Sequence, residues 1–416
     1  MIFSSHWGRM LWLFLCGFNG AVGTNLEVRW FYLVVGFSWV DLMIAYEALR
    51  LSLRDSPRRG LFTGRLQGTH ALAVSGLVTW LIFSIAVNAF RFDAQIVDVL
   101  PCLKLLYLVL LTTVIARYAS KYGVKVLVLG FVCGVLVVTI QDLIMSPRSV
   151  GLVPLLQNPN VTGALIGLGV WFSAFGLVLG WPLLTNLLAA LTLTGLSITT
   201  FSKGTWLMCA LGLAMGILTV LTRRQSPASV LARFLTGALA LAMLVGASVI
   251  AYENRDALEY SFSHKYATSV EEGGGIDARA DFVRASIRAG LDYPVFGLGF
   301  RNFYKTQILY PDLDLPQLER LDNAHNLFAQ ILVAGGIPGL VLFVILFWIP
   351  FFVLWHKLEW WLPSRSNRVI VWTLSLGVWF IYGAVQLQLM AQPPFWLFCG
   401  IVFGLQRNQI SAASSR

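Results

Sequence analysis

Apolar runs recur along almost the whole chain, separated by short polar connections. A bilayer core takes about 20 apolar residues per helix, so each run predicts a membrane span. The expected spans are residues 10–24, 28–49, 69–90, 96–116, 124–145, 161–179, 183–200, 205–222, 231–252, 326–355, 369–388 and 393–406. The pattern therefore predicts an all-α polytopic membrane protein of about 12 transmembrane helices.

One polar stretch, residues 253–322, interrupts the apolar runs and holds 12 of the chain's 20 acidic residues beside eight Lys and Arg. It is too polar to insert, yet too rich in Phe, Tyr and Leu for a plain linker. Within it, residues 278–291 have helical periodicity, and Tyr293-Pro294 ends the pattern. We expect nine spans in residues 1–251, a folded loop with short helices in 252–325, and three spans in 326–416.

Composition agrees with the membrane class, because 57% of the residues are hydrophobic and only 12% are charged, against about 25% charged in soluble domains. All five cysteines lie in apolar runs, where they predict packing rather than disulfides or metal ligation. We expect no metal and no cofactor.

The formal net charge of +10 comes from basic residues concentrated in alternate connections. These residues are Arg50, Arg54, Arg58, Arg59 and Arg65, then Arg117, Lys121 and Lys125, then Arg223, Arg224 and Arg233, then Lys357, Arg365 and Arg368. Cytoplasmic loops carry such an excess, so both termini are expected in the cytoplasm and the long loop outside. The charge is therefore a topology signal and predicts no nucleic-acid partner.

Arg279 is the first candidate for chemistry. At about 100° per residue it lies with Phe282, Ser286 and Ile287 on the apolar side of the loop helix. A guanidinium on such a face needs an anionic or carbonyl partner, because burying an unpaired charge costs several kcal/mol. The alternative is an ion pair with an acid elsewhere in the loop.

His325 is the second candidate and lies just before a long apolar run. Capping by Asp322 or Asn323 would place the imidazole in the first turn of the helix. Helix N-terminal amides favour an anion and a neutral imidazole, which can accept a proton. The alternative is a polar anchor at the membrane surface.

Lys203 lies in a tight turn between two apolar runs, expected on the outer side, where basic residues are less frequent. A ligand contact and a lysine that extends its amine to the membrane surface are both compatible with this position. Arg301, within Gly297-Leu298-Gly299-Phe300-Arg301-Asn302, is a fourth candidate; no strand precedes its glycines, so a dinucleotide site is not expected.

Other ionisable residues have structural interpretations. Asp312 and Asp314 have a spacing that can hold a divalent ion, but their outward location argues against nucleotide-sugar chemistry. Asp41, Lys104 and Asp142 fall in or near apolar spans, where such residues are costly. We expect pairing between helices, with an ion path as the alternative.

Three segments together resemble the O-antigen ligase and polymerase superfamily, the multi-span enzymes that act on undecaprenyl-diphosphate-linked glycans outside the bacterial inner membrane. Ser202-Lys203-Gly204-Thr205-Trp206-Leu207 resembles the family's Ser-Arg-Gly-x-Trp-Leu turn, with Lys203 in place of Arg. Arg279 followed by Pro294, Gly297 and Gly299 resembles the loop Arg and its Pro-x-x-Gly-x-Gly segment. His325-Asn326, with Gly335, Gly336, Gly339 and Leu340, resembles the His-Asn start of a span.

The resemblance implies an inverting, metal-independent glycosyltransferase in the inner membrane with its active site facing the periplasm. Its donor would be an undecaprenyl-diphosphate-linked glycan and its acceptor lipid A-core. His325 would act as base, and Arg279, Lys203 and Arg301 would bind the diphosphate. A polymerase or protein O-oligosaccharyltransferase of the same superfamily remains an alternative. A transporter or lipid flippase is the alternative of another class.

Overall fold

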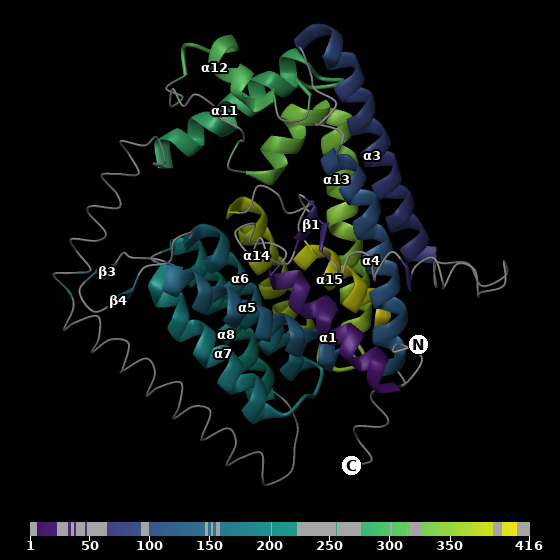
Figure 1. Ribbon diagram of the computed structural model, residues 1–416, viewed down its shortest axis with the longest axis vertical. Coiled ribbons are helices and arrows are strands. Elements are labelled where there is room, and N and C mark those ends of the chain that lie inside the picture. The colour runs from purple at the N-terminus through teal and green to yellow at the C-terminus, as the bar shows by residue number, and fades with distance from the viewer. Residues whose placement is uncertain are drawn as a thin grey trace.

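The structure, a computed structural model, describes residues 6–22, 32–34, 37–38, 46–47, 65–92, 100–145, 149–150, 153–154, 159–200, 202–222, 255, 276–299, 302–313, 315, 324, 326–385 and 393–405. Within these residues the protein is helical apart from two short strand pairs (Figure 1). Strand β1 (Tyr32–Val34) pairs with β2 (Phe37–Ser38), and β3 (Ser149–Val150) pairs with β4 (Val153–Pro154), both antiparallel.

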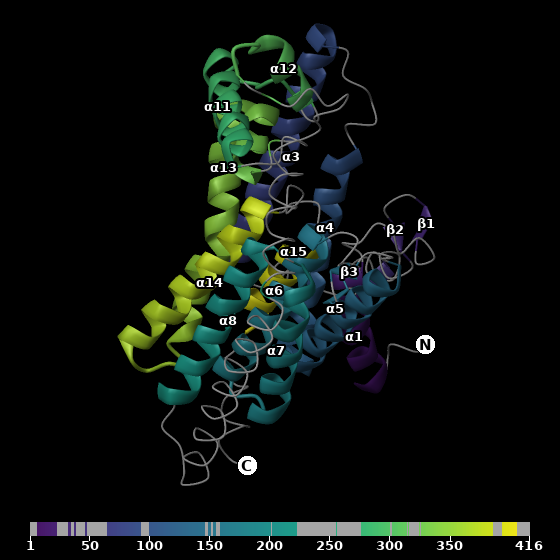
Figure 2. The same ribbon diagram turned by 90° about the vertical axis from the view of Figure 1, so that its left-hand side faces the viewer.

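The helices fall into a membrane-type bundle and a small group above it. The bundle helices are α1 (His6–Val22), α3 (Arg65–Phe92), α4 (Leu100–Tyr122), α5 (Lys125–Met145), α6 (Pro159–Val178), α7 (Leu183–Ser197), α8 (Lys203–Thr222), α13 (Leu327–Leu358), α14 (Arg365–Val385) and α15 (Pro393–Gly404). The loop contributes α11 (Ile276–Asp292), the 3-10 turn η6 (Asn302–Tyr304) and α12 (Lys305–Leu309), while η5 (Ile198–Thr200) extends α7. Figures 1 and 2 show α11 and α12 beside the upper ends of α3 and α13.

Six of the described helical segments are long and apolar enough to cross a membrane. They are Gly68–Phe90, Lys125–Ile144, Val161–Val178, Leu183–Thr200, Lys203–Thr222 and Leu327–Leu358, with shorter apolar helices at Leu105–Ala119 and Pro393–Gly404. The predicted helical membrane architecture is confirmed for these residues. The count of about 12 spans and the sidedness stay predictions, and the expected span over residues 231–252 lies outside the described residues.

The expected span over residues 28–49 is wrong in its middle, where β1 and β2 pair Tyr32 with Ser38 and Val34 with Phe37. Aromatic and β-branched residues fit strands as well as they fit a buried helix. An apolar run alone therefore does not distinguish a short strand pair from a span.

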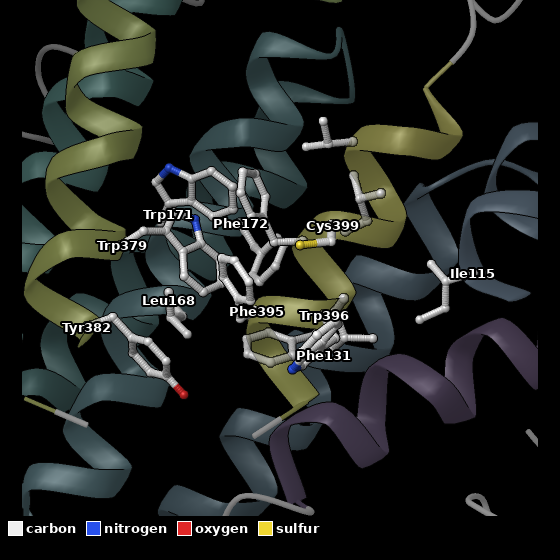
Figure 3. Close-up of a cluster of buried hydrophobic side chains, with 14 of the residues drawn as sticks. Ile115, Phe131, Leu168, Trp171, Phe172, Trp379, Tyr382, Phe395, Trp396 and Cys399 are labelled. Atoms are coloured by element: carbon white, nitrogen blue, oxygen red, sulfur yellow. The ribbon is translucent and has the colours of Figure 1, made fainter. Parts of the chain in front are cut away.

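An aromatic core holds the bundle together (Figure 3). Helix α6 packs against α5, α7, α8 and α14. The rings of Trp171 on α6 and Trp379 on α14 meet edge to face with centroids 5.6 Å apart, and Phe395 of α15 lies 5.8 Å from Trp379. The indole nitrogen of Trp171 also donates to the Ser375 hydroxyl at 3.1 Å. These contacts fix α14 against α6, and α14 in turn links α8 to α13.

Helix α13 is broken at Gly336, whose φ of 64° and ψ of −163° lie outside the helical region. The carbonyl of Val333 loses its helical partner there, because the Ile337 N–H donates to the Pro294 carbonyl at 2.8 Å instead. The carbonyl of Ala334 also loses its partner, because Pro338 has no N–H. A helix broken within an apolar bundle must satisfy these groups in another way.

The replacement donors come from the loop and from α3. The Leu298 N–H donates to the Val333 carbonyl at 2.7 Å. The Ser84 hydroxyl, on α3, lies 2.6 Å from the Ala334 carbonyl and 2.6 Å from the Phe296 carbonyl. The Trp80 indole donates to the Gly335 carbonyl at 2.7 Å. We call this set, formed by Trp80 and Ser84, residues 294–299, and Val333–Ile337, the loop junction.

Two glycines allow the loop junction to close. A Cβ on Gly336 would lie 2.5 Å from the Pro294 oxygen and 2.6 Å from the Val295 oxygen. A Cβ on Gly297, where φ is 61°, would lie 2.2 Å from the Val333 oxygen. Both positions combine a backbone conformation that side chains rarely adopt with contact distances that exclude any side chain.

Replacing Gly336 with alanine should lower the free energy of unfolding by about 2 kcal/mol or more, from backbone strain plus the overlap with the loop carbonyls. The measurement is the thermal unfolding midpoint of the detergent-solubilised protein, followed by tryptophan fluorescence. Gly195→Ala in α7 is the matched control, because its new Cβ meets no atom within 4 Å. Equal midpoints for Gly336→Ala and Gly195→Ala would contradict this role of Gly336.

Candidate functional site

The loop helix predicted over residues 278–291 is confirmed as α11, Ile276–Asp292. Its buried face consists of Phe282, Ala285, Ser286, Ala289 and Gly290. The expected apolar face is wrong at Ile287, which is 49% exposed. The small Ala285 and Ala289 take that place in the core, because they let α11 pack closely on its neighbours.

Arg279 lies on the buried side of α11 by helical register, one turn before Phe282 and two turns before Ser286. Phe282 and Ala289 share one buried cluster with Leu298, Phe303 and Ala324. We call this cluster the loop core. The Arg279 side chain lies outside the described part of the structure, so its partner stays a prediction.

The opposite face of α11 carries the predicted charges, and two of its arginines have carboxylate partners. Arg284 pairs with Asp281 at 2.7 Å, and Arg288 pairs with Asp312 at 2.5 Å. The hydrogen bond from Arg288 lowers the pKa of Asp312 below its ordinary value. The Tyr310 hydroxyl donates to Asp292 at 2.8 Å, and burial raises the pKa of that phenol.

The ion pair of Asp312 bears on whether Asp312 and Asp314 could bind a divalent metal ion. Asp312 already binds an arginine, while Asp314 lies outside the described residues. No group of three or more His, Cys, Asp or Glu that could hold a metal ion occurs among the described residues. The arrangement around Asp312 fits a surface ion pair that fastens α11 to the segment after α12.

The start of α13 differs from the expectation in one respect. Asn326, not Asp322 or Asn323, is the N-cap, and its side-chain oxygen accepts from Phe328 N at 3.0 Å and Ala329 N at 3.2 Å. Helix α13 therefore begins at Leu327, so His325 precedes the cap instead of occupying the first turn. The expected placement is wrong because Asn326 itself supplies a short acceptor at the position a cap requires.

Lys203 is exposed at the first residue of α8. Before it, the buried Ser202 donates its N–H to the Thr200 hydroxyl at 3.1 Å, and the Trp206 indole donates to the Ser197 carbonyl at 2.9 Å. The turn is thus fixed by its own residues, while the Lys203 side chain is exposed. The positive end of a helix dipole lies at the same point and favours an anion.

Contacts through α14 bring the starts of α8 and α13 to one end of the bundle. Met215 of α8 lies 3.5 Å from the Ser375 hydroxyl, and Leu211 lies beside Gly377, so α8 and α14 are antiparallel. Following α8 back to Lys203 therefore leads toward the end of α14.

The end of α14 lies against the start of α13. Leu327 lies beside Gly383, and the Phe328 and Phe380 rings are 5.7 Å apart. Helix α11 joins the same region, because Gly290 lies beside Leu332 and Phe282 shares the loop core with Ala324. The start of α8 and helix α11 thus both lie at the end of the bundle where α13 begins.

Other sequence candidates divide between described and undescribed residues. Arg301, His325 and Asp41 lie outside the described residues, as does the side chain of Lys104. Asp142 is buried and accepts the Thr162 hydroxyl at 2.7 Å. This contact joins α5 to α6 and agrees with a structural role for Asp142.

Residues 187–344 match the family model described as O-antigen ligase. The match supports the O-antigen ligase and polymerase superfamily. Members of that family are glycosyl-transferring enzymes that act on lipid-linked glycans. The matched range contains α8, α11, the loop junction's loop segment and the start of α13, and therefore all four sequence candidates, Lys203, Arg279, Arg301 and His325. No curated protein matches the chain.

Sequence reasoning missed several residues that shape the site. Trp80 and Ser84 read as ordinary members of an apolar span, although they satisfy the broken helix. Gln330 is the one polar residue between Leu327 and Ile337. Its position in an apolar run could have identified it as a residue with a specific partner. A buried amide in an apolar helix needs a partner, so its presence predicts a specific hydrogen bond.

Loss of the Asn326 cap should be measurable. Asn326→Ala is expected to lower the free energy of unfolding by about 1 kcal/mol, because two first-turn N–H groups lose their acceptor. Asn326→Asp and Asn326→Ser keep a capping oxygen and should stay close to wild type in the same thermal unfolding assay. If all three variants unfold at one midpoint, Asn326 does not act as a cap.

Proposed function

We propose that this chain is an O-antigen ligase that transfers a glycan from undecaprenyl diphosphate to lipid A-core oligosaccharide at the periplasmic face of the bacterial inner membrane. The reaction would be inverting and would need no metal or cofactor. The supporting observation is the family match over residues 187–344 together with the approach of α8, α11 and α13 to one end of the bundle.

The chemistry assigns a task to each candidate. An acceptor hydroxyl attacks the anomeric carbon, its C–O bond forms, and the bond from that carbon to the diphosphate oxygen breaks. The hydroxyl proton passes to His325 as base, and the electron pair of the broken bond leaves with undecaprenyl diphosphate. Positive charge from Arg279, Lys203 and Arg301 would stabilise the diphosphate as its charge grows.

Lys203 differs from the arginine usual in the family. Its amine supplies a single charge, whereas a guanidinium can bind two phosphate oxygens at once. The exposed position at the start of α8 adds the helix dipole and first-turn amides to that charge. Lysine at this position therefore remains a competent diphosphate ligand.

Deletion of the gene should leave polymer on undecaprenyl diphosphate and lipid A-core without it, and wild-type protein should restore transfer. His325→Ala should not, because transfer without the base is expected to fall by about 100-fold or more. The readout is lipopolysaccharide gel analysis, with membrane levels of each variant checked by immunoblot.

His264→Ala is the matched control, since it removes another histidine of the loop that lies outside the three motif segments. Restoration by His325→Ala would refute the assignment of the base. Single-repeat caps on lipid A-core in the deletion strain would instead identify a polymerase. Unchanged lipopolysaccharide in that strain, with transport by the purified protein in liposomes, would favour a transporter.

Charge at Lys203 can be tested separately. Lys203→Gln should raise the KM for the donor by about tenfold, which corresponds to about 1.4 kcal/mol of lost diphosphate binding. Lys203→Arg should retain at least wild-type activity, because it restores the usual fork. The measurement is transfer with purified donor and acceptor, and Lys305→Gln in α12 controls for loss of one loop charge. Equal KM values for both glutamine variants would remove Lys203 from the site.

A further inference from the structure

Gln330 makes an unusual connection at the start of α13. It is 8% exposed, and the neighbouring residues from Leu327 to Ile337 are otherwise apolar or glycine. Its side-chain oxygen accepts the N–H of Ala324, six residues earlier, at 2.8 Å. Ala324 precedes the N-cap Asn326, so this bond satisfies none of the N–H groups in the first turn of α13.

Ala324 is the point where this bond meets the loop. It is 1% exposed, and its methyl group belongs to the loop core with Phe282 and Leu298. Phe282 lies one turn after Arg279 on α11, and Leu298 bonds to the broken part of α13. Gln330 therefore connects a spanning helix to the buried cluster on which α11 rests.

A second side chain fixes the chain on the other side of residue 325. Asn326 holds the first turn through Phe328 N and Ala329 N. Together the two amides anchor Ala324 and Asn326, the immediate neighbours of His325. The Asn326 bonds are those of an ordinary helix cap, whereas the Gln330 bond adds nothing to the helix itself and orders only the chain before it.

We propose that Gln330 is a positioning residue for glycan transfer: its side-chain oxygen, by holding the Ala324 amide, fixes the junction between the loop core and α13 at which residue 325 lies. The inference rests on the proposed function, since it assigns Gln330 a part in the transfer reaction. Gln330 acts through the backbone and touches neither substrate nor leaving group.

The test compares two substitutions of similar size. Gln330→Glu retains an oxygen that accepts the Ala324 N–H, and Gln330→Met removes it. In transfer with purified donor and acceptor, Gln330→Met should lower kcat at least tenfold while the KM for the donor changes less than twofold. Gln330→Glu should recover at least half of the wild-type kcat, because burial disfavours ionisation of the new carboxyl and its neutral form restores the acceptor.

A control variant distinguishes a positioning role of Gln330 from a general loss of protein stability. Ile331→Val removes one methyl group from the next buried residue of α13 and leaves the Gln330 bond intact. It should lower the thermal unfolding midpoint while keeping the wild-type kcat. A purely structural role for Gln330 predicts instead that kcat follows the midpoint across all three variants.

The outcomes are distinguishable from failure of the proposed function. Wild-type kcat in Gln330→Met, or a Gln330→Glu variant as slow as Gln330→Met, would overturn the positioning role while leaving glycan transfer in place. Absence of transfer by the wild-type protein would overturn the proposed function and this inference with it.

Discussion

The carbonyl groups released where α13 breaks at Gly336 constrain the rest of this structure. Inside an apolar bundle such groups have no water to bind, and leaving one unsatisfied costs several kcal/mol. Three elements distant in sequence therefore meet at one place: Trp80 and Ser84 on α3, the loop segment at Leu298, and the break itself. The requirement for hydrogen bonds thus holds the loop segment 294–299 against α3 and α13, directly after the end of α11.

The three segments that resemble the family contain residues with a structural role beside the candidate site residues. Gly297 and Gly336 have backbone angles and close contacts that admit no side chain, and Asn326 caps a helix. Their presence in the motifs is explained by folding alone. Lys203, in the turn segment, is exposed at the first residue of α8. The roles of Arg279, Arg301 and His325 stay proposals.

Hydropathy located α5, α6 and α8 to within a few residues, because a span must be continuously apolar. Periodicity likewise found α11, whose charged and buried faces differ clearly. The same signals failed at β1 and β2, where apolar residues serve a strand pair, and at Ile287, which is exposed because Ala285 and Ala289 pack more closely. Neither pattern contains the tertiary partner of Gln330, because its bond to Ala324 depends on where the loop core lies. Local sequence therefore predicts elements, and long-range packing decides their contacts.

Helices α8 and α13 begin at the same end of the bundle, and this arrangement bears on the lysine at position 203. A helix start carries roughly half a positive charge through its dipole, and its first amides point beyond the helix. The aromatic contacts between α6 and α14 hold both starts in place through α14, since α14 contacts α8 at Leu211 and α13 at Leu327. Under the proposed function, a diphosphate at the start of α8 would meet the backbone charge of that helix in addition to the Lys203 amine, whereas the first-turn amides of α13 are already bound by Asn326.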